Sequence, residues 1–155
     1  MSPVTAVHLL QGLETLPLRM ERHVANATAI AEFLDAQEVI DNVTYPALAA
    51  HPDHELAKRL LPKGAGAVFS FEIRGGRTAG RKLIEGLQIF SHLANVGDAK
   101  SLVIHPASTT HSRMDDEALR AAGISEGLVR LSVGLENVSD LIDDLSRAIY
   151  QSQKV

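Results

Sequence analysis

Apolar side chains recur at every third or fourth position over the first part of the chain. This spacing places them on one side of a helix and predicts a helical stripe, formed by Leu9, Leu13, Leu16, Met20, Val24, Ala27, Ala31 and Leu34. Pro17 lies inside the stripe, where it removes a backbone donor and crowds the preceding turn. We therefore expect a kink there, or two helices that meet. Residues 1–36 are interpreted as a connecting helix whose first half packs on something outside this chain. The alternative is a free-standing amphipathic helix that packs on its own domain.

Beyond residue 36 the pattern changes to short strands alternating with helices. Residues 67–73 alternate cleanly, which is typical of a half-buried strand: one face has Ala67, Phe69, Phe71 and Ile73, and the other has Val68, Ser70 and Glu72. Further strands are predicted at residues 39–44, 101–105 and 128–133, and helices at 53–61, 78–87, 116–122 and 138–149. Such a sheet has one face free of helices. The predicted fold class is therefore α/β, with helices on one face of a short mixed or antiparallel sheet.

Composition narrows the class of protein. The 155 residues suit one domain, 45% are apolar and 22% charged, and no apolar run is long enough for a membrane helix. The first residues lack the basic region of a signal peptide, and the net charge of −4 argues against nucleic acid as a partner. With no cysteine, disulfides and thiolate sites are excluded. We expect a cytoplasmic domain with neither membrane nor nucleic-acid partners.

Arg130 is the first candidate for chemistry. Val129, Leu131 and Val133 point into the core, so Arg130 and Ser132 share the opposite face. An arginine inside an apolar strand needs an anion, and its planar fork fits a carboxylate through two parallel hydrogen bonds. The functional interpretation is a substrate-carboxylate clamp. The alternatives are a salt bridge to a neighbouring acid or an edge-strand arginine that reaches solvent.

A second candidate lies in the run Leu93-Ala-Asn-Val-Gly-Asp. Gly97 permits a tight turn, and Asn95 has an amide that both donates and accepts. Metal binding is not predicted, because the histidine pairs have neither helical spacing nor an acidic third ligand at a recognisable interval. No Gly-x-Ser-x-Gly elbow indicates a serine hydrolase.

Five segments occur together and in order: GLETLPLRMERHVANA, VTYPALAAHPDHELAKR, GAGAVFSFEI, LANVGDAKSLVIHPASTTHS and GISEGLVRLSVGLENVSDLIDDLSRAI. Over essentially the whole chain they resemble the C-terminal part of the pyridoxal-phosphate enzymes of cysteine and methionine metabolism. The resemblance implies a fold type I enzyme in which residues 1–36 connect a large cofactor-binding domain to a small C-terminal domain, residues 37–155. It also implies that the large domain, an amino-acid substrate and further copies of the chain, as a tetramer, are the partners.

The resemblance assigns two residues to the substrate. Arg130 stands where the family has the arginine that binds the α-carboxylate. Asn95 stands where many members have a serine that also touches this carboxylate. Its Asn-Val-Gly-Asp form is similar to the O-acetylhomoserine sulfhydrylases, as is the run through Pro17. The implied activity of the whole enzyme is a transfer that makes homocysteine from O-acetylhomoserine and sulfide.

The family's catalytic lysine is not recognisable. None of the five lysines has the sequence context of the residue that forms a Schiff base with pyridoxal phosphate: Lys58, Lys63, Lys82, Lys100 and Lys154. We therefore expect pyridoxal phosphate in the full-length enzyme, but no bound cofactor, no catalytic residue and no turnover on this chain alone. Alternatives that stay open are a cystathionine gamma-synthase, a methionine gamma-lyase and a stand-alone oligomerisation module.

Overall fold

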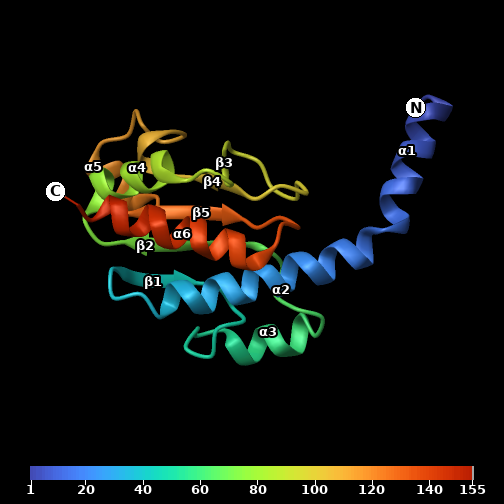
Figure 1. The fold of residues 1–155 in the computed structure, drawn as a ribbon, viewed down its shortest axis with the longest axis horizontal. Coiled ribbons are helices and arrows are strands. Elements are labelled where there is room, and N and C mark those ends of the chain that lie inside the picture. The colour runs from blue at the N-terminus through green and yellow to red at the C-terminus, as the bar shows by residue number, and fades with distance from the viewer. Residues whose placement is uncertain (155) are drawn as a thin grey trace.

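The computed structural model describes residues 1–154, apart from the side chain of Asp116. The helices are α1 (Pro3–Glu14), α2 (Leu16–Asp35), α3 (His54–Leu60), α4 (Gly76–Gly86), α5 (Asp116–Ala121) and α6 (Val138–Ser152), with a single 3₁₀ turn at Pro106–Ser108. The strands are β1 (Ile40–Thr44), β2 (Val68–Ile73), β3 (Ser91–His92), β4 (Leu102–Ile104) and β5 (Leu128–Ser132). Figure 1 shows α1 extending away from a body formed by the other elements. No helix within residues 1–154 is both long and apolar enough to cross a membrane.

The first predicted helix is two helices that meet at Thr15. Pro17 lies in the first turn of α2, a position that needs no backbone donor, which confirms the break expected from the sequence. Arg19 bridges the junction, since its guanidinium donates to the backbone oxygen of Gly12 and to the hydroxyl of Thr15. No residue of α1 is buried. The apolar stripe is therefore buried only in its second half, where α2 contributes its buried apolar side chains Ala27, Ile30, Ala31 and Leu34.

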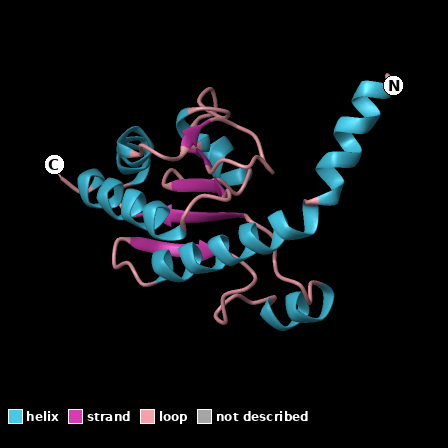
Figure 2. Cartoon of the chain, turned by 45° about the vertical axis from the view of Figure 1, so that its right-hand side comes forward, coloured by secondary structure: helices cyan, strands magenta, loops and turns pink. Residues whose placement is uncertain are grey.

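The five strands form one mixed sheet in the order β1-β2-β5-β4-β3 (Figure 2). All neighbours are antiparallel except β3 and β4, which are parallel. The expected mixed sheet is confirmed. Strand β3 was not predicted, because two residues are too few to show an alternation. It lies at one edge of the sheet, and β5 is the central strand.

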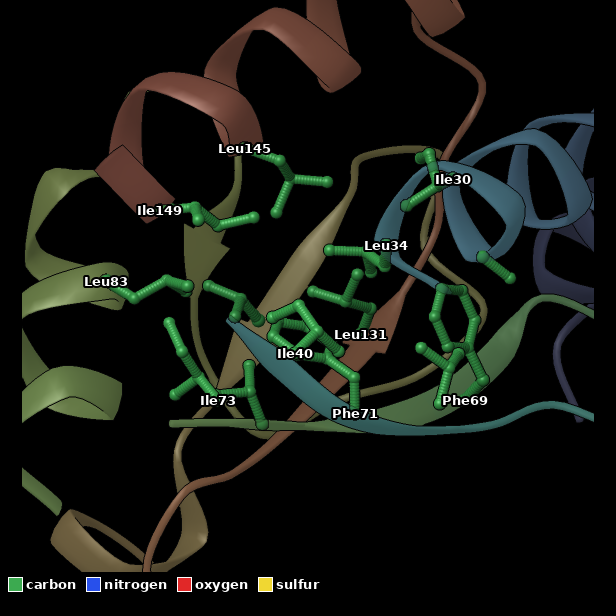
Figure 3. Close-up of a cluster of buried hydrophobic side chains, with 14 of the residues drawn as sticks. Ile30, Leu34, Ile40, Phe69, Phe71, Ile73, Leu83, Leu131, Leu145 and Ile149 are labelled. Carbon is green, nitrogen blue, oxygen red and sulfur yellow. The ribbon is translucent and has the colours of Figure 1, made fainter. Parts of the chain in front are cut away.

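The helices α2, α4 and α6 cover one face of this sheet and enclose the main hydrophobic core (Figure 3). The alternation predicted for residues 67–73 is confirmed, because Phe69, Phe71 and Ile73 are at most 4% exposed while Val68 is 44% exposed. Leu83 of α4 and Leu145 of α6 are fully buried above them. The opposite face of β2 and β5 is thus left for polar side chains.

The ends of the helices differ in how they are capped. Asn137 caps α6 by accepting the backbone N–H of Ser139. Asp53 occupies the cap position of α3, but its side chain makes no capping hydrogen bond. Its backbone N–H donates to Nδ1 of His51, and this bond does not involve the N–H groups of the first turn of α3, which a side-chain cap would bind.

Candidate functional site

Arg130 lies on the central strand, on the face that the three covering helices leave open. It pairs with Ser70 of β2 and with Ile104 of β4. Its neighbours in sequence, Val129 and Leu131, are fully buried in the core on the other face. Arg130 itself is half-buried. The predicted orientation is therefore confirmed, and hydrogen bonds on both sides fix the backbone of this residue.

The Arg130 guanidinium makes no hydrogen bond or ion pair with any other residue among those the structure describes. The acid nearest by register is Glu72, which faces Leu128, two pairs further along β2 and β5. No ion pair joins Glu72 to Arg130. The guanidinium nitrogens of Arg130 have no partner in the chain, and they are not fully buried. A ligand can therefore reach them. The salt-bridge alternative is not realised in this structure, and the central position of β5 removes the edge-strand alternative.

A loop of residues 93–100, which joins β3 to β4, is fastened beside Arg130. The backbone N–H of Gly97 donates to Oγ of Ser132 at 3.2 Å, and Ser132 is only 3% exposed. Ser132 lies two positions from Arg130 on the same face, about 7 Å along the strand. Gly97 has a φ of +77°, which lets the loop turn its N–H toward the strand. We call this segment the Asn95 loop.

Asn95 is at the exposed tip of that loop. Its Oδ1 accepts the backbone N–H of Val96 at 2.9 Å, which uses the acceptor of the amide and leaves its NH₂ group pointing away from that bond. The structure fastens the loop that carries Asn95 to Ser132, two residues from Arg130, but does not place the side chains of Asn95 and Arg130 in hydrogen-bond contact. Asn95 and Arg130, the two residues predicted from the sequence, are thus linked indirectly, through the hydrogen bond between Gly97 and Ser132.

The base of the Asn95 loop is held by a group of polar residues that sequence reasoning missed. Glu136 accepts two hydrogen bonds from Ser101, one from the backbone N–H at 2.7 Å and one from the hydroxyl at 2.9 Å. The Ser101 hydroxyl in turn accepts the backbone N–H of Gly134 at 2.8 Å. The backbone N–H of Leu135 donates to the oxygen of Ala99 at 2.9 Å. The segment that follows β5 is thereby joined to the end of the loop.

Helix α2 holds the same segment from the other side. Nδ1 of His23 donates to the backbone oxygen of Val133 at 2.6 Å, and its ring is 4% exposed. Nδ2 of Asn26 donates to the backbone oxygens of Gly134 and Glu136 at 3.0 and 2.9 Å. The only sequence signal for either residue was a polar side chain beside the apolar stripe. These bonds fix α2 relative to the strand that bears Arg130.

His105 is fully buried at the end of β4 and has both ring nitrogens occupied. Nε2 lies 2.7 Å from the backbone oxygen of Glu126, which can only accept, so Nε2 carries the proton and Nδ1 accepts from Oγ of Ser108 at 2.8 Å. Burial lowers the pKa of this imidazole below its ordinary 6.5; the hydrogen bond to Glu126 opposes the decrease in part, and the nearby charge of Arg77 adds to it. The ring has a structural position, because both of its nitrogens are hydrogen-bonded within the chain. Within the described residues, no three histidine or acidic side chains are grouped to hold a metal ion.

The lysines of the chain do not fit pyridoxal phosphate. All five are exposed. Lys58 is paired with Glu55 at 3.0 Å, Nζ of Lys82 donates to the backbone oxygen of Lys154 at 2.8 Å, and Nζ of Lys154 lies over the ring of Tyr150. A lysine that forms a stable Schiff base needs a protected environment that lowers its pKa. No such lysine is present among residues 1–154.

Comparison with known proteins identifies the family to which this fold belongs. Residues 1–150 match the family described as Cys/Met metabolism PLP-dependent enzyme. The chain belongs to this family. Its fold is that of the fold type I members, since 92% of the chain superimposes on a putative O-acetylhomoserine (thiol)-lyase from Campylobacter jejuni with a TM-score of 0.84 and 47% identity. The crystal structure of that protein contains a pyridoxyl-lysine monophosphate.

Several activities occur among the relatives. The chain is 51% identical over 149 residues to O-acetyl-L-homoserine sulfhydrylase from Leptospira meyeri, covering 96% of the chain and 34% of that enzyme. It is 47% identical over 152 residues to L-methionine gamma-lyase from Pseudomonas putida, covering 98% of the chain and 38% of that enzyme. A cystathionine gamma synthase from Xanthomonas oryzae matches with a TM-score of 0.84 and 46% identity over 93% of the chain and 37% of its own. The chain thus spans about a third of the length of these relatives.

Proposed function

We propose that the chain is the C-terminal small domain, residues 37–155, with its connecting helix, residues 1–36, of a pyridoxal-phosphate-dependent transferase that makes homocysteine from O-acetylhomoserine and sulfide. Its contribution is the site for the α-carboxylate of the substrate. One observation supports this most directly: Arg130 presents an unpaired guanidinium on a fixed central strand, beside a loop tied to the same strand. The preference for the sulfhydrylase reaction rests on the Asn-Val-Gly-Asp form of the loop and on the 51% identity to the Leptospira meyeri enzyme.

The proposed roles follow from the chemistry of the two side chains. The fork of Arg130 binds both oxygens of a carboxylate through parallel N–H donors. The NH₂ group of Asn95 supplies a further donor from the loop. Holding the carboxylate orients the rest of the amino acid toward the reacting centre, which is a positioning effect. The exposed lysines do not hold pyridoxal phosphate, so we assign the cofactor, whose ring acts as an electron sink, to the remaining two-thirds of the enzyme.

The proposal is tested by Arg130→Ala in the full-length enzyme. The loss of a charge-assisted pair at a half-buried site removes about 1.5–3 kcal/mol, so KM for O-acetylhomoserine should rise about tenfold or more. Arg130→Lys should recover little of this, because an ammonium group cannot bind both oxygens in the same geometry. The matched control is Arg113→Ala, since Arg113 is exposed and makes no ion pair with a described residue. An unchanged kcat/KM in Arg130→Ala would exclude the clamp.

A lyase or synthase reaction is the second candidate, because methionine gamma-lyases and a cystathionine gamma synthase are similar to the chain at 46–47% identity. The same carboxylate site would serve each of them. Release of acetate from O-acetylhomoserine in the presence of sulfide indicates the transferase, whereas release of 2-oxobutyrate from methionine indicates the lyase. A non-enzymatic oligomerisation module is a third candidate, favoured only by the exposed apolar side chains of α1. A tetramer of the full enzyme and a cytoplasmic location are further proposals, from the family resemblance alone.

A further inference from the structure

We infer that Glu136 is a positioning residue for the proposed carboxylate site: through Ser101 it holds the Asn95 loop against the end of β5 and so sets Asn95 relative to Arg130. This inference rests on the proposed function. It assigns a role to a side chain that touches neither Arg130 nor Asn95.

The carboxylate of Glu136 is bonded to one residue. Both carboxylate oxygens accept from Ser101, and no other group among the described residues donates to them. Ser101 is fully buried, so its N–H and O–H have no water to replace the carboxylate. Loss of either acceptor leaves a buried donor without a partner. The geometry therefore makes the position of Ser101 depend on Glu136.

Ser101 stands where the Asn95 loop enters β4, and the chain is crowded there. The Ser101 carbonyl accepts the backbone N–H of Ser91 at 2.9 Å, which closes the two ends of the loop on each other. A Cβ placed on Gly134 would collide with the Glu136 carboxylate and with backbone atoms of Ala99 and Lys100. Glycine at position 134 is what allows the segment after β5 to approach the loop so closely. The loop base, the carboxylate and the end of β5 thus form one packed unit.

Further along the loop, the Gly97 N–H bond to Ser132 is the only hydrogen bond among the described residues that fixes the loop to the sheet. At 3.2 Å this is a long, neutral hydrogen bond, and such bonds are weak compared with those to a carboxylate. The stronger bonds of Glu136 therefore determine where the loop lies, and Gly97 then reaches Ser132. Without Glu136, Asn95 would sample a wider range of positions relative to Arg130.

A capping role for Glu136 does not explain these contacts. Helix α6 begins at Val138, and its cap is Asn137, whose side chain already accepts the N–H of Ser139. Glu136 is also outside the main hydrophobic core. Its removal should loosen the Asn95 loop while α2, α4 and α6 stay packed on the sheet.

The test uses the full-length holoenzyme and two competitive inhibitors of O-acetylhomoserine turnover. L-Norleucine keeps the α-carboxylate but has no group to expel, and n-pentylamine is the same molecule without the carboxylate. In Glu136→Gln, which keeps the size of the side chain but exchanges one acceptor for a donor, the inhibition constant of norleucine should rise roughly fivefold. That of pentylamine should stay within about twofold, because only carboxylate recognition is affected. The matched control is Glu38→Gln, at an exposed glutamate near the start of β1 whose side chain makes no hydrogen bond or ion pair with a described residue.

Arg130→Ala distinguishes a failure of the proposed function from a failure of the positioning role of Glu136. If it leaves norleucine inhibition unchanged, the proposed function fails, and the inference fails with it. If Arg130→Ala weakens norleucine alone while Glu136→Gln behaves like Glu38→Gln, only the positioning role is overturned. An equal rise for both inhibitors would also overturn it, since that is what a general structural defect produces.

Ser101→Ala provides a second variant should Glu136→Gln fold poorly. It removes the hydroxyl that links Glu136 to Gly134. The same selective loss of norleucine binding is expected, together with faster amide hydrogen exchange over residues 97–101 and unchanged exchange at Val129 and Leu131. Faster exchange in the loop with unaltered norleucine binding would overturn the inference.

Discussion

Replacing Gly80 by alanine should destabilise the chain, although alanine is the better helix former. Gly80 is a buried residue of α4 that faces the His105 ring. A Cβ at this position would lie 2.5 Å from Nε2 and 2.7 Å from Cδ2 of that ring. Ordinary contacts are about 3.5–4.0 Å, so the ring or the helix must move by roughly 1 Å.

The size of the effect follows from what holds the ring in place. His105 is fully buried, and Nε2 is the atom that donates to the Glu126 carbonyl. An overpacked methyl group costs about 1–3 kcal/mol, and breaking the bond to Glu126 leaves a buried polar pair unsatisfied at a further cost of about 1–3 kcal/mol. The gain from placing alanine in a helix interior is about 1 kcal/mol. The two costs together exceed this gain, so the free energy of unfolding should fall by about 1–5 kcal/mol.

Urea unfolding of the 155-residue chain, followed by far-UV circular dichroism, measures this change through the midpoint at a constant slope. Gly12→Ala is the control, because a Cβ at Gly12 meets nothing within 4 Å; its midpoint should not fall. In a His105→Ala background the collision partner is absent, so Gly80→Ala should cost little there. A midpoint for Gly80→Ala equal to or above that of the unchanged chain would refute the reasoning, as would an equal cost in both backgrounds.

Three other predictions concern protonation, the cofactor and α1. Burial lowers the pKa of His105 below its ordinary 6.5. Below pH 6.5 the unfolded chain therefore binds a proton that the folded chain excludes. The contribution of His105 to stability is complete above pH 6.5 and is lost as the pH falls toward the lowered pKa. The urea midpoint should therefore fall more between about pH 7 and about pH 5.5 in the unchanged chain than in His105→Gln, and equal slopes would contradict this. Pyridoxal phosphate added to this chain should give no stable adduct that borohydride traps on one lysine, because all five lysines are exposed; a single trapped lysine would disprove the expectation. Leu9 and Leu13 are 53% and 59% exposed on α1, so the chain should self-associate in sedimentation velocity, and Leu9→Gln with Leu13→Gln should reduce this; a monomeric unchanged chain would contradict it.

The parts of the fold that the sequence predicts well are those set by local periodicity. The alternation at residues 67–73 and the helical stripe at residues 138–149 were recognisable because burial on one face leaves a repeating pattern. Strand β3 is too short for such a pattern, and its pairing with β4 is fixed by tertiary contacts. The stripe over residues 9–34 was correctly identified as helical, but spacing alone did not reveal that only its second half is buried.

In the candidate site, too, the features set by local periodicity were predictable and those fixed by long-range contacts were not. The face shared by Arg130 and Ser132 follows from the two-residue period of a strand, so it was predictable. The bonds of Glu136 with Ser101 span 35 residues, and those of Asn26 with the segment after β5 span 108–110 residues. No local pattern distinguishes such a glutamate or asparagine from a solvated one. Long-range polar contacts of this kind become visible only when the sheet order is known.

The position of Arg130 on the innermost strand has a consequence for how members of such a family diverge. Strands on both sides fix its backbone, so substitutions elsewhere on the surface leave the guanidinium where it is. The Asn95 loop, by contrast, connects two parallel strands at the sheet's edge, where residues can be inserted or exchanged without disturbing the register of β1, β2 and β5. Under the proposed roles, Arg130 binds the α-carboxylate that all amino-acid substrates share from a fixed position, while the second donor to that carboxylate stands on a loop that can change. The strength and geometry of carboxylate binding can then be altered through one short connection.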